Sequence, residues 1–317
     1  MKVGFIGLGN VGSKLSGSLL RNGVDLLVHD LEQERLKRLE SFGARIVKNP
    51  AEMMKLCEVV ITCLPSPSIS AQVMEGRNGL LEANCHGKIW MEMSTSDEAE
   101  VKRLGSRIKD AGGLAVDCPV SGGCHRADTG NISIFAGCDR ATFEIILPLL
   151  EKMGRRILHT GELGSASVLK VITNYLATAN LVSLSEALVV AKASGMDLKT
   201  TYEGIKISSG NSFVHETESQ VILNGSRDIS FTMDLVFKDV GIFQNIASKY
   251  GIPLEISPML LEIFQDGIKS YGERELSPNI IRRLEDKTGL KITAKGFPSE
   301  IVDNETEECG YEVVIRT

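Results

Sequence analysis

One lysine stands inside a helix that should otherwise be apolar. The segment GELGSASVLKVITNYL (161–176) predicts a helix with apolar residues all around its axis, so most of its surface should be buried. Lys170 lies in the middle of this surface, and Asn174 follows one turn later on the same face. A buried lysine is costly unless it has a partner or a chemical role.

Proton transfer is the chemical role that suits such a lysine. Oxidation of an alcohol by hydride transfer leaves a proton to be removed from the oxygen, and a base that titrates near neutrality does this best. Desolvation brings a lysine toward that range. The alternative is that Lys170 runs along the helix until its ammonium group reaches solvent. The helix alone leaves both interpretations open.

A glycine cluster near the start of the chain predicts a dinucleotide-binding site. Gly7, Gly9 and Gly12 form GxGxxG between a strand-like run and a helical one, which is the context that gives the motif its meaning. Gly7 permits a tight turn, Gly9 lets the backbone approach a pyrophosphate, and Gly12 lets the helix pack on the strand. The helix N-terminus offers N–H groups to the phosphates. The expected cofactor-binding residues here are Gly7, Leu8, Gly9, Asn10, Val11 and Gly12.

The residue at the end of the second strand-like run favours NAD over NADP. Asp30 follows Gly12 by 18 residues, where a carboxylate would bind the ribose hydroxyls and repel a 2′-phosphate. Arg35 could serve a 2′-phosphate, but it lies a turn into a charged helix, where we expect it to be solvated.

The wider pattern predicts an α/β fold with two domains. Helical stretches lie between successive strand-like runs, which indicates a parallel sheet with right-handed crossovers. These runs are 3–8, 24–30, 58–65, 87–95, 112–120 and 132–138. After about residue 160 only helical segments follow, at 164–194, 197–207, 212–223, 231–250, 255–271 and 277–288.

We therefore predict an N-terminal Rossmann-type dinucleotide-binding domain followed by an all-α C-terminal domain. The first spans residues 1–162, and the second, for substrate binding and oligomerisation, spans residues 163–290. A C-terminal tail, residues 291–317, is acidic and then β-rich, and the sequence does not define its role.

Composition argues against several classes of function. The 317-residue chain has a net charge of −6, which argues against nucleic acid as its main partner. No run approaches the ~18 consecutive apolar residues of a membrane span, and the first strand leads into glycines rather than a signal-peptide cleavage site. Seven cysteines without CxxC spacing argue against zinc and disulfides. We expect a cytoplasmic protein without a metal or a membrane partner.

Three later strand ends carry further candidates, because ligands of parallel sheets bind at the carboxyl ends of strands. Leu64 and Pro65 in CLPSPS, and Thr95 in MSTSDE, should lie along the dinucleotide. Residues 121–123, SGG, offer a hydroxyl and successive N–H groups that could form a concavity for a carboxylate. A simple turn is the alternative for this last motif.

In this order the motifs resemble the β-hydroxyacid dehydrogenase family. VGFIGLGNVG, CLP, MST, DCPVSGG, GxxGxxxxxKxxxN and FxxxLxxKD occur in register over about residues 2–290. 3-Hydroxyisobutyrate dehydrogenase is the familiar member, and 6-phosphogluconate dehydrogenase is more distant. The run LSPNIIRRLEDKTGL is most similar to 2-(hydroxymethyl)glutarate dehydrogenase.

The resemblance implies a function and a set of roles. The function is NAD-dependent oxidation of a short 3-hydroxy acid to its semialdehyde, or the reverse reduction, in a homodimer or homotetramer. Lys170 would be the general acid/base and Asn174 would hold the small anionic substrate. The implied substrate-binding residues are Ser121, Gly122 and Gly123, and the implied cofactor neighbours are Leu64, Pro65, Thr95 and Lys238, with Asp239 beside the last.

The sequence departs from the family most after the SGG motif. Arg126 replaces a glycine, with His125 before it. Arg126 could grip a second anionic group of the substrate through a bidentate contact, or it could point to solvent, and the sequence leaves both open. Thr173 and Glu98 also replace the usual residues, an asparagine or histidine and a proline respectively.

Two other functions compete with the dehydrogenase. A semialdehyde or imine reductase of the same superfamily is one, although the imine reductases lack the lysine that stands here at Lys170. A non-catalytic NAD-binding scaffold is the other, since a fold alone does not fix a function. Neither the particular hydroxy acid nor the physiological direction can be read from the sequence.

Overall fold

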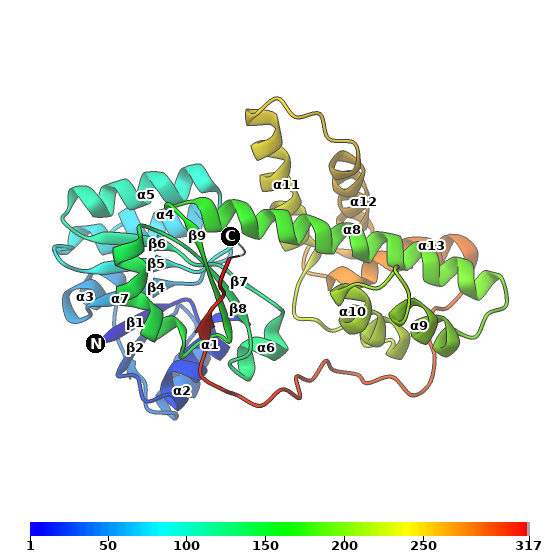
Figure 1. Cartoon of the computed structure of the whole chain (residues 1–317), viewed down its shortest axis with the longest axis horizontal. Helices are drawn as coiled ribbons and strands as arrows, with labels where there is room; N and C mark the ends of the chain where they lie inside the picture. Colours follow the sequence, from blue (N-terminus) through cyan, green and yellow to red (C-terminus); the bar gives the residue numbers. More distant parts are fainter. Residues whose placement is uncertain (316–317) are drawn as a thin grey trace. The chain divides into compact units, whose positions relative to one another are not determined.

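The computed structural model describes residues 1–315, which form two compact units. The first unit contains Met1–Lys170 together with the end of the chain from Asp303 onward, and the second contains Val171–Val302 (Figure 1). The predicted α/β architecture, a Rossmann-type domain followed by a helical one, is confirmed.

The first unit is built on one mixed sheet. Its strand order is β10-β9-β8-β6-β5-β4-β1-β2-β3, and β7 pairs with β8 off this path. The strands are β1 Val3–Ile6, β2 Leu26–His29, β3 Arg45–Ile46, β4 Val59–Thr62, β5 Ile89–Glu92, β6 Leu114–Asp117, β7 Val120–Ser121, β8 Ser133–Gly137, β9 Arg156–Gly161 and β10 Tyr311–Glu312.

The prediction of a parallel sheet is wrong at β8, which is antiparallel to both of the strands that precede it, β6 and β7. β8 runs antiparallel to β6, whereas the strands from β3 to β6 are all parallel. After β6 the chain continues into β7 and turns back to pair with β8, Val120 opposite Ile134. The segment between β7 and β8 contains no crossover helix long enough to return the chain to the end of the sheet where the preceding strand began. β8 therefore runs in the opposite direction.

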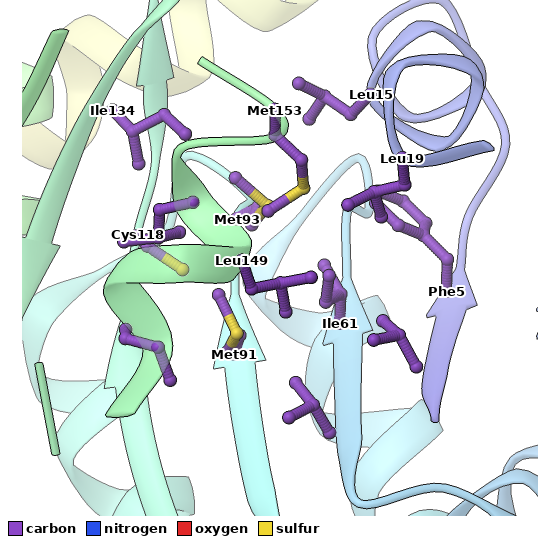
Figure 2. Close-up of a cluster of buried hydrophobic side chains, with 14 of the residues drawn as sticks. Phe5, Leu15, Leu19, Ile61, Met91, Met93, Cys118, Ile134, Leu149 and Met153 are labelled. Carbon is purple, nitrogen blue, oxygen red and sulfur yellow. The ribbon is translucent and has the colours of Figure 1, made fainter. Parts of the chain in front are cut away.

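Alternating strands and helices bury a common core in this unit. Phe5 of β1, Ile61 of β4 and Met91 of β5 belong to the same buried cluster as Leu15 and Leu19 of α1 (Gly12–Arg21), as Figure 2 shows. All five side chains are fully buried, as expected for apolar residues packed between a sheet and the helices that cover it. The helices are α1 Gly12–Arg21, α2 Gln33–Glu40, α3 Pro50–Leu56, α4 Pro67–Glu75, η1 Leu80–Glu82, α5 Glu98–Asp110, α6 Cys124–Asp128 and α7 Arg140–Leu150.

The second unit is helical in the predicted order. α8 is continuous over Ser165–Ala193, so its first six residues belong to the first unit. The helices that follow are α9 Leu198–Lys206, α10 Phe213–Asn224, α11 Met233–Lys249, α12 Ile256–Tyr271, η2 Ser277–Ile281 and α13 Arg282–Thr288. Within residues 1–315, α8 is the one helix long and apolar enough to cross a membrane, a test that core helices also pass.

A buried carboxyl in α10 should make the stability of this unit depend on pH. Oε2 of Glu218 is buried without a hydrogen-bond partner among the described residues, and burial raises the pKa of Glu218 to about 8. The folded state therefore keeps a proton that the unfolded chain releases above about pH 5. The free energy of unfolding should fall as the pH rises from about 5 to about 8.

Glu218→Gln should remove this dependence, because the amide does not titrate. We expect the Tm of the wild type, relative to that of Glu218→Gln, to fall between about pH 5.5 and about pH 7.5. Thermal unfolding of both proteins at the two pH values measures this, and a Tm difference that does not change with pH would contradict it.

The tail that we set apart from the two domains is divided between the units. Ala294 donates its N–H to the carbonyl of Leu223, and the side chain of Asn224 donates to the carbonyl of Phe297, which joins the first part to α10. The last part adds β10 to the edge of the sheet, with Tyr311 paired in parallel to Arg156. The β-rich end of the chain therefore extends the sheet of the first unit.

Candidate active site

The glycine motif leaves room for a ligand at one of its three glycines. A Cβ on Gly12 would lie 2.0 Å from the carbonyl oxygen of Gly7, so the packing of α1 on β1 requires glycine there. A Cβ on Gly9 would meet nothing closer than Nη1 of Arg35, at 4.0 Å. The fold itself therefore does not need glycine at position 9, and the open backbone fits close approach by a pyrophosphate.

Asp30 is fixed beside this motif. Its carboxylate accepts the N–H of Leu8 at 2.6 Å and the N–H of Glu32 at 2.8 Å, and the side chain is 8% exposed. Arg35, which we expected to be solvated, pairs with Glu32 at 2.9 Å and lies 3.8 Å from Asp30. Asp30, which follows β2, is therefore a carboxylate whose negative charge is partly balanced by Arg35.

A buried glutamate links the two loops that carry Leu64, Pro65 and Thr95. The N–H of Leu64 donates to Oγ of Ser94 at 2.7 Å, and the N–H of Ser94 donates to Oε1 of Glu92 at 2.9 Å. The Ser94 hydroxyl donates to the same Glu92 oxygen. Burial raises the pKa of Glu92, which lies at the end of β5. The loops after β4 and β5 are therefore held in one fixed arrangement.

The SGG motif turns the chain from β7 into α6. Ser121 pairs with Ser133 of β8, and Gly122 and Gly123 follow with φ of 125° and 88°. Side chains disfavour these conformations, which accounts for both glycines. The aliphatic part of Arg126 covers this turn, since its Cδ lies 3.3 Å from where a Gly122 Cβ would be.

Lys170 is buried, and the helix that carries it is anchored by an aspartate. Both oxygens of Asp117, at the end of β6, accept backbone N–H groups from the start of α8: Gly164 at 2.7 Å and Ser167 at 2.7 Å. Burial raises the pKa of Asp117, and the two N–H groups act against this rise. Lys170 follows Ser167 by three residues, on the same side of the helix, and is 9% exposed.

A second aspartate joins Asn174 and Lys238 within the helical unit. The amide of Asn174 donates to Oδ2 of Asp239 at 2.6 Å, and Nζ of Lys238 lies 3.1 Å from Oδ1. Asp239 is 2% exposed. We expected Asp239 only as a neighbour of Lys238, and its role as a link between α8 and α11 emerges from the fold.

The structure thus groups the predicted residues by unit. The glycine motif, Asp30, the loops after β4 and β5, the SGG motif, Arg126 and Lys170 belong to the first unit, and Asn174 and Lys238 belong to the second. Lys170 and Asn174 lie one turn apart on α8. Among residues 1–315, no three His, Cys, Asp or Glu side chains are grouped so as to hold a metal ion.

Two family models cover most of the chain. Residues 2–161 match the NAD binding domain of 6-phosphogluconate dehydrogenase, and residues 164–284 match a domain described as NAD-binding of NADP-dependent 3-hydroxyisobutyrate dehydrogenase. An N-terminal dinucleotide-binding domain and a helical C-terminal domain are therefore both present.

Individual relatives agree with these matches. 2-(Hydroxymethyl)glutarate dehydrogenase of Eubacterium barkeri is 32% identical over 294 residues, covering 92% of this chain and 98% of that protein. A probable mitochondrial 3-hydroxyisobutyrate dehydrogenase of Dictyostelium discoideum is 32% identical over 283 residues, covering 87% of this chain and 88% of that protein. A solved 3-hydroxyisobutyrate dehydrogenase from Salmonella typhimurium shares the fold, with a TM-score of 0.82, 23% identity, and coverage of 89% of this chain and 99% of that one.

The chain belongs to the β-hydroxyacid dehydrogenase family. It is accordingly an NAD(P)-binding oxidoreductase.

Proposed function

We propose that this protein oxidises a short 3-hydroxy acid to its semialdehyde with NAD, or catalyses the reverse reduction. The observation that carries the proposal is the buried Lys170 on a helix whose first turn is fixed by Asp117. A lysine that lies 9% exposed on an anchored helix is held in place, as a general base must be.

Lys170 would take the proton of the substrate hydroxyl at Nζ during oxidation and return it during reduction. A bound nicotinamide would supply the acceptor for the hydride that leaves the carbinol carbon. Ser121, Gly122 and Gly123 would bind the substrate carboxylate through the hydroxyl and N–H groups of their turn. Asn174, whose amide is oriented by Asp239, would hold the substrate oxygen one helical turn from Lys170.

Residues near the cofactor would come from several elements. The glycine motif would receive the pyrophosphate at Gly9, and Asp30 the adenosine ribose. The loops held together by Glu92, with Leu64, Pro65 and Thr95, would border the dinucleotide. We assign Lys238 to the nicotinamide side on family resemblance.

NADH formation at 340 nm, with a panel of 3-hydroxy acids, tests this function. Monocarboxylates, dicarboxylates and sulfonates should be compared at equal concentration, and the semialdehyde product identified by trapping with a hydrazine. We expect at least one class to be oxidised. If no acid is oxidised and no semialdehyde is reduced, the dehydrogenase proposal fails and a non-catalytic NAD-binding scaffold becomes the better account.

The preference for NAD should depend on the charge of Asp30. Asp30→Asn keeps an acceptor for the N–H of Leu8 but removes the charge that would repel a 2′-phosphate, and it releases Arg35 from its acidic neighbour. We expect the ratio of kcat/KM for NADP to that for NAD to rise by about tenfold or more.

Glu34→Gln is the matched control for this change. Glu34 is exposed on the same helix as Arg35, so its substitution removes one negative charge without touching the carboxylate that faces the glycine motif. Steady-state kinetics with both cofactors should give a near wild-type ratio for Glu34→Gln. An equal shift in the two variants would contradict a specific role for Asp30.

We further propose a cytoplasmic homodimer or homotetramer. The support is a set of apolar side chains that remain exposed on the helical unit: Phe237, Tyr250, Ile252, Ile256 and Met259. Exposed apolar surface of this kind commonly marks a contact with another chain.

A further inference from the structure

Acidic side chains attach the end of the chain to the first unit. Glu307 pairs with Arg21 at 3.2 Å and Glu312 pairs with Arg140 at 2.6 Å, while Glu308 pairs with Arg155. The second family model ends at residue 284, so these three glutamates lie in a part of the chain beyond both models.

One segment of this tail is held firmly beside α6. The buried amide of Asn131 donates to Oδ2 of Asp303 at 2.8 Å and to the carbonyl oxygen of Glu305 at 2.9 Å. The hydroxyl of Thr129 donates to the same Asp303 oxygen. Asn131 is 1% exposed, so the backbone from Asp303 to Glu305 is fixed by an interior group rather than by surface charges alone.

This arrangement brings a carboxylate to Arg126. Oε1 of Glu305 lies 3.3 Å from Nη2 of Arg126, and Oε2 lies 3.9 Å from Nη2 of Arg156. The stem of Arg126 covers the turn at Gly122. His125, between the turn and Arg126 in sequence, adds no positive charge at neutral pH, because burial and the nearby Arg126 lower its pKa.

The positive charge of Arg126 therefore lies beside the SGG motif, and the carboxylate of Glu305 already balances part of it. A substrate with a second carboxylate would have to compete with Glu305 for the guanidinium of Arg126. A substrate whose remainder is uncharged does not meet this competition.

We propose that Glu305 is a specificity-determining residue, which disfavours substrates with a second carboxylate by pairing with Arg126 beside the SGG motif. The inference rests on the proposed function, in which Ser121, Gly122 and Gly123 bind the first carboxylate. It makes the substrate a 3-hydroxy monocarboxylate, and it gives the tail a role in substrate selection.

A matched pair of substrates tests this inference. 2-(Hydroxymethyl)glutarate and 2-(hydroxymethyl)pentanoate have the same chain length and differ by a terminal carboxylate in place of a methyl group. Glu305→Gln should raise the ratio of kcat/KM for the dicarboxylate to that for the monocarboxylate by about three- to fivefold, which is the size expected for a half-exposed ion pair. The change should lie mainly in the KM of the dicarboxylate.

Two variants serve as controls. Glu312→Gln also removes one charge from the tail, but that charge pairs with Arg140, so the ratio should stay near the wild-type value. Arg126→Ala combined with Glu305→Gln should abolish the gain, because no guanidinium is left to receive the second carboxylate. An equal ratio in Glu305→Gln and Glu312→Gln, or a gain that persists without Arg126, would overturn the inference.

Measurements of ligand binding test this inference independently of the proposed function. The rise in Tm caused by glutarate and by pentanoate can be measured for the wild type and Glu305→Gln without any turnover. A larger effect of glutarate on the variant supports the role of Glu305 even if no hydroxy acid is oxidised. Equal effects on both proteins contradict that role even if the wild type proves to be a dehydrogenase.

Discussion

Lys170→Ala is expected to lower kcat by about a hundredfold or more while NAD still binds with near wild-type affinity. A positioned general base typically contributes a factor of about 10² to 10⁴, and alanine leaves no group on this part of α8 to take the proton. Because Lys170 is 9% exposed, solvent has little access to replace it. Steady-state kinetics on the substrate found in the panel, with NAD affinity from fluorescence titration, measure both quantities.

Two further variants show whether the loss reflects proton transfer. Lys192→Ala removes a lysine from the exposed last turn of the same helix and should leave kcat unchanged. Lys170→Arg keeps a positive charge but cannot release its proton near neutral pH, so it should be almost as impaired as the alanine variant. A Lys170→Arg enzyme with near wild-type kcat would mean that Lys170 supplies charge rather than a base.

Asp117→Ala is expected to have the largest effect on stability. The change leaves the N–H groups of Gly164 and Ser167 buried without an acceptor, and each such group costs about 1–3 kcal/mol. We expect the free energy of unfolding of the first unit to fall by about 3 kcal/mol, which corresponds to a drop in Tm of roughly 6–12 °C. Differential scanning calorimetry measures this directly.

Asp139→Ala is the comparison that isolates burial as the cause. Asp139 likewise accepts a backbone N–H, from Thr142 at 2.9 Å, but at the exposed start of α7. Water can replace that contact, so the loss should be about 1 kcal/mol. Equal losses in the two variants would show that the anchor at α8 is no more than an ordinary helix cap.

In Asp117→Ala molecules that remain folded, kcat should also fall, because Lys170 loses its fixed position.

The elements of the fold were predictable because their patterns are local. Strands such as VVIT in β4 are continuous apolar runs, and the helices of the second unit keep a regular apolar spacing, so both follow from neighbouring residues. β9, RILHTG, was missed because polar residues interrupt it and its partner β8 lies about twenty residues earlier. The antiparallel direction of β8 was missed because it depends on how the chain returns after β7.

The candidate site was predictable where a motif carries the chemistry. The glycines, Asp30 and Lys170 stand out by residue type and spacing. Asp117, Glu92 and Asp239 do not, because their roles depend on contacts with distant segments: Asp117 with Gly164 and Ser167, Asp239 with Asn174 of another helix. Nothing in the local sequence distinguishes a carboxylate that anchors a helix from one in solvent.

Arg126 shows the same limit in another way. The sequence left its direction open between substrate and solvent, and the fold adds a third partner, Glu305, 179 residues later. A partner supplied by the far end of the chain leaves no signature near Arg126, so only the folded tail reveals it.

Chemical rescue of Lys170→Ala tests the central claim most directly, because it asks whether the missing group is a base. Small primary amines of graded basicity should be added at fixed pH, with substrate and NAD saturating. We expect kcat to rise in proportion to the concentration of free amine and to increase with amine basicity. If the variant binds substrate and NAD as the wild type does but no amine raises its kcat, Lys170 does not act as the base.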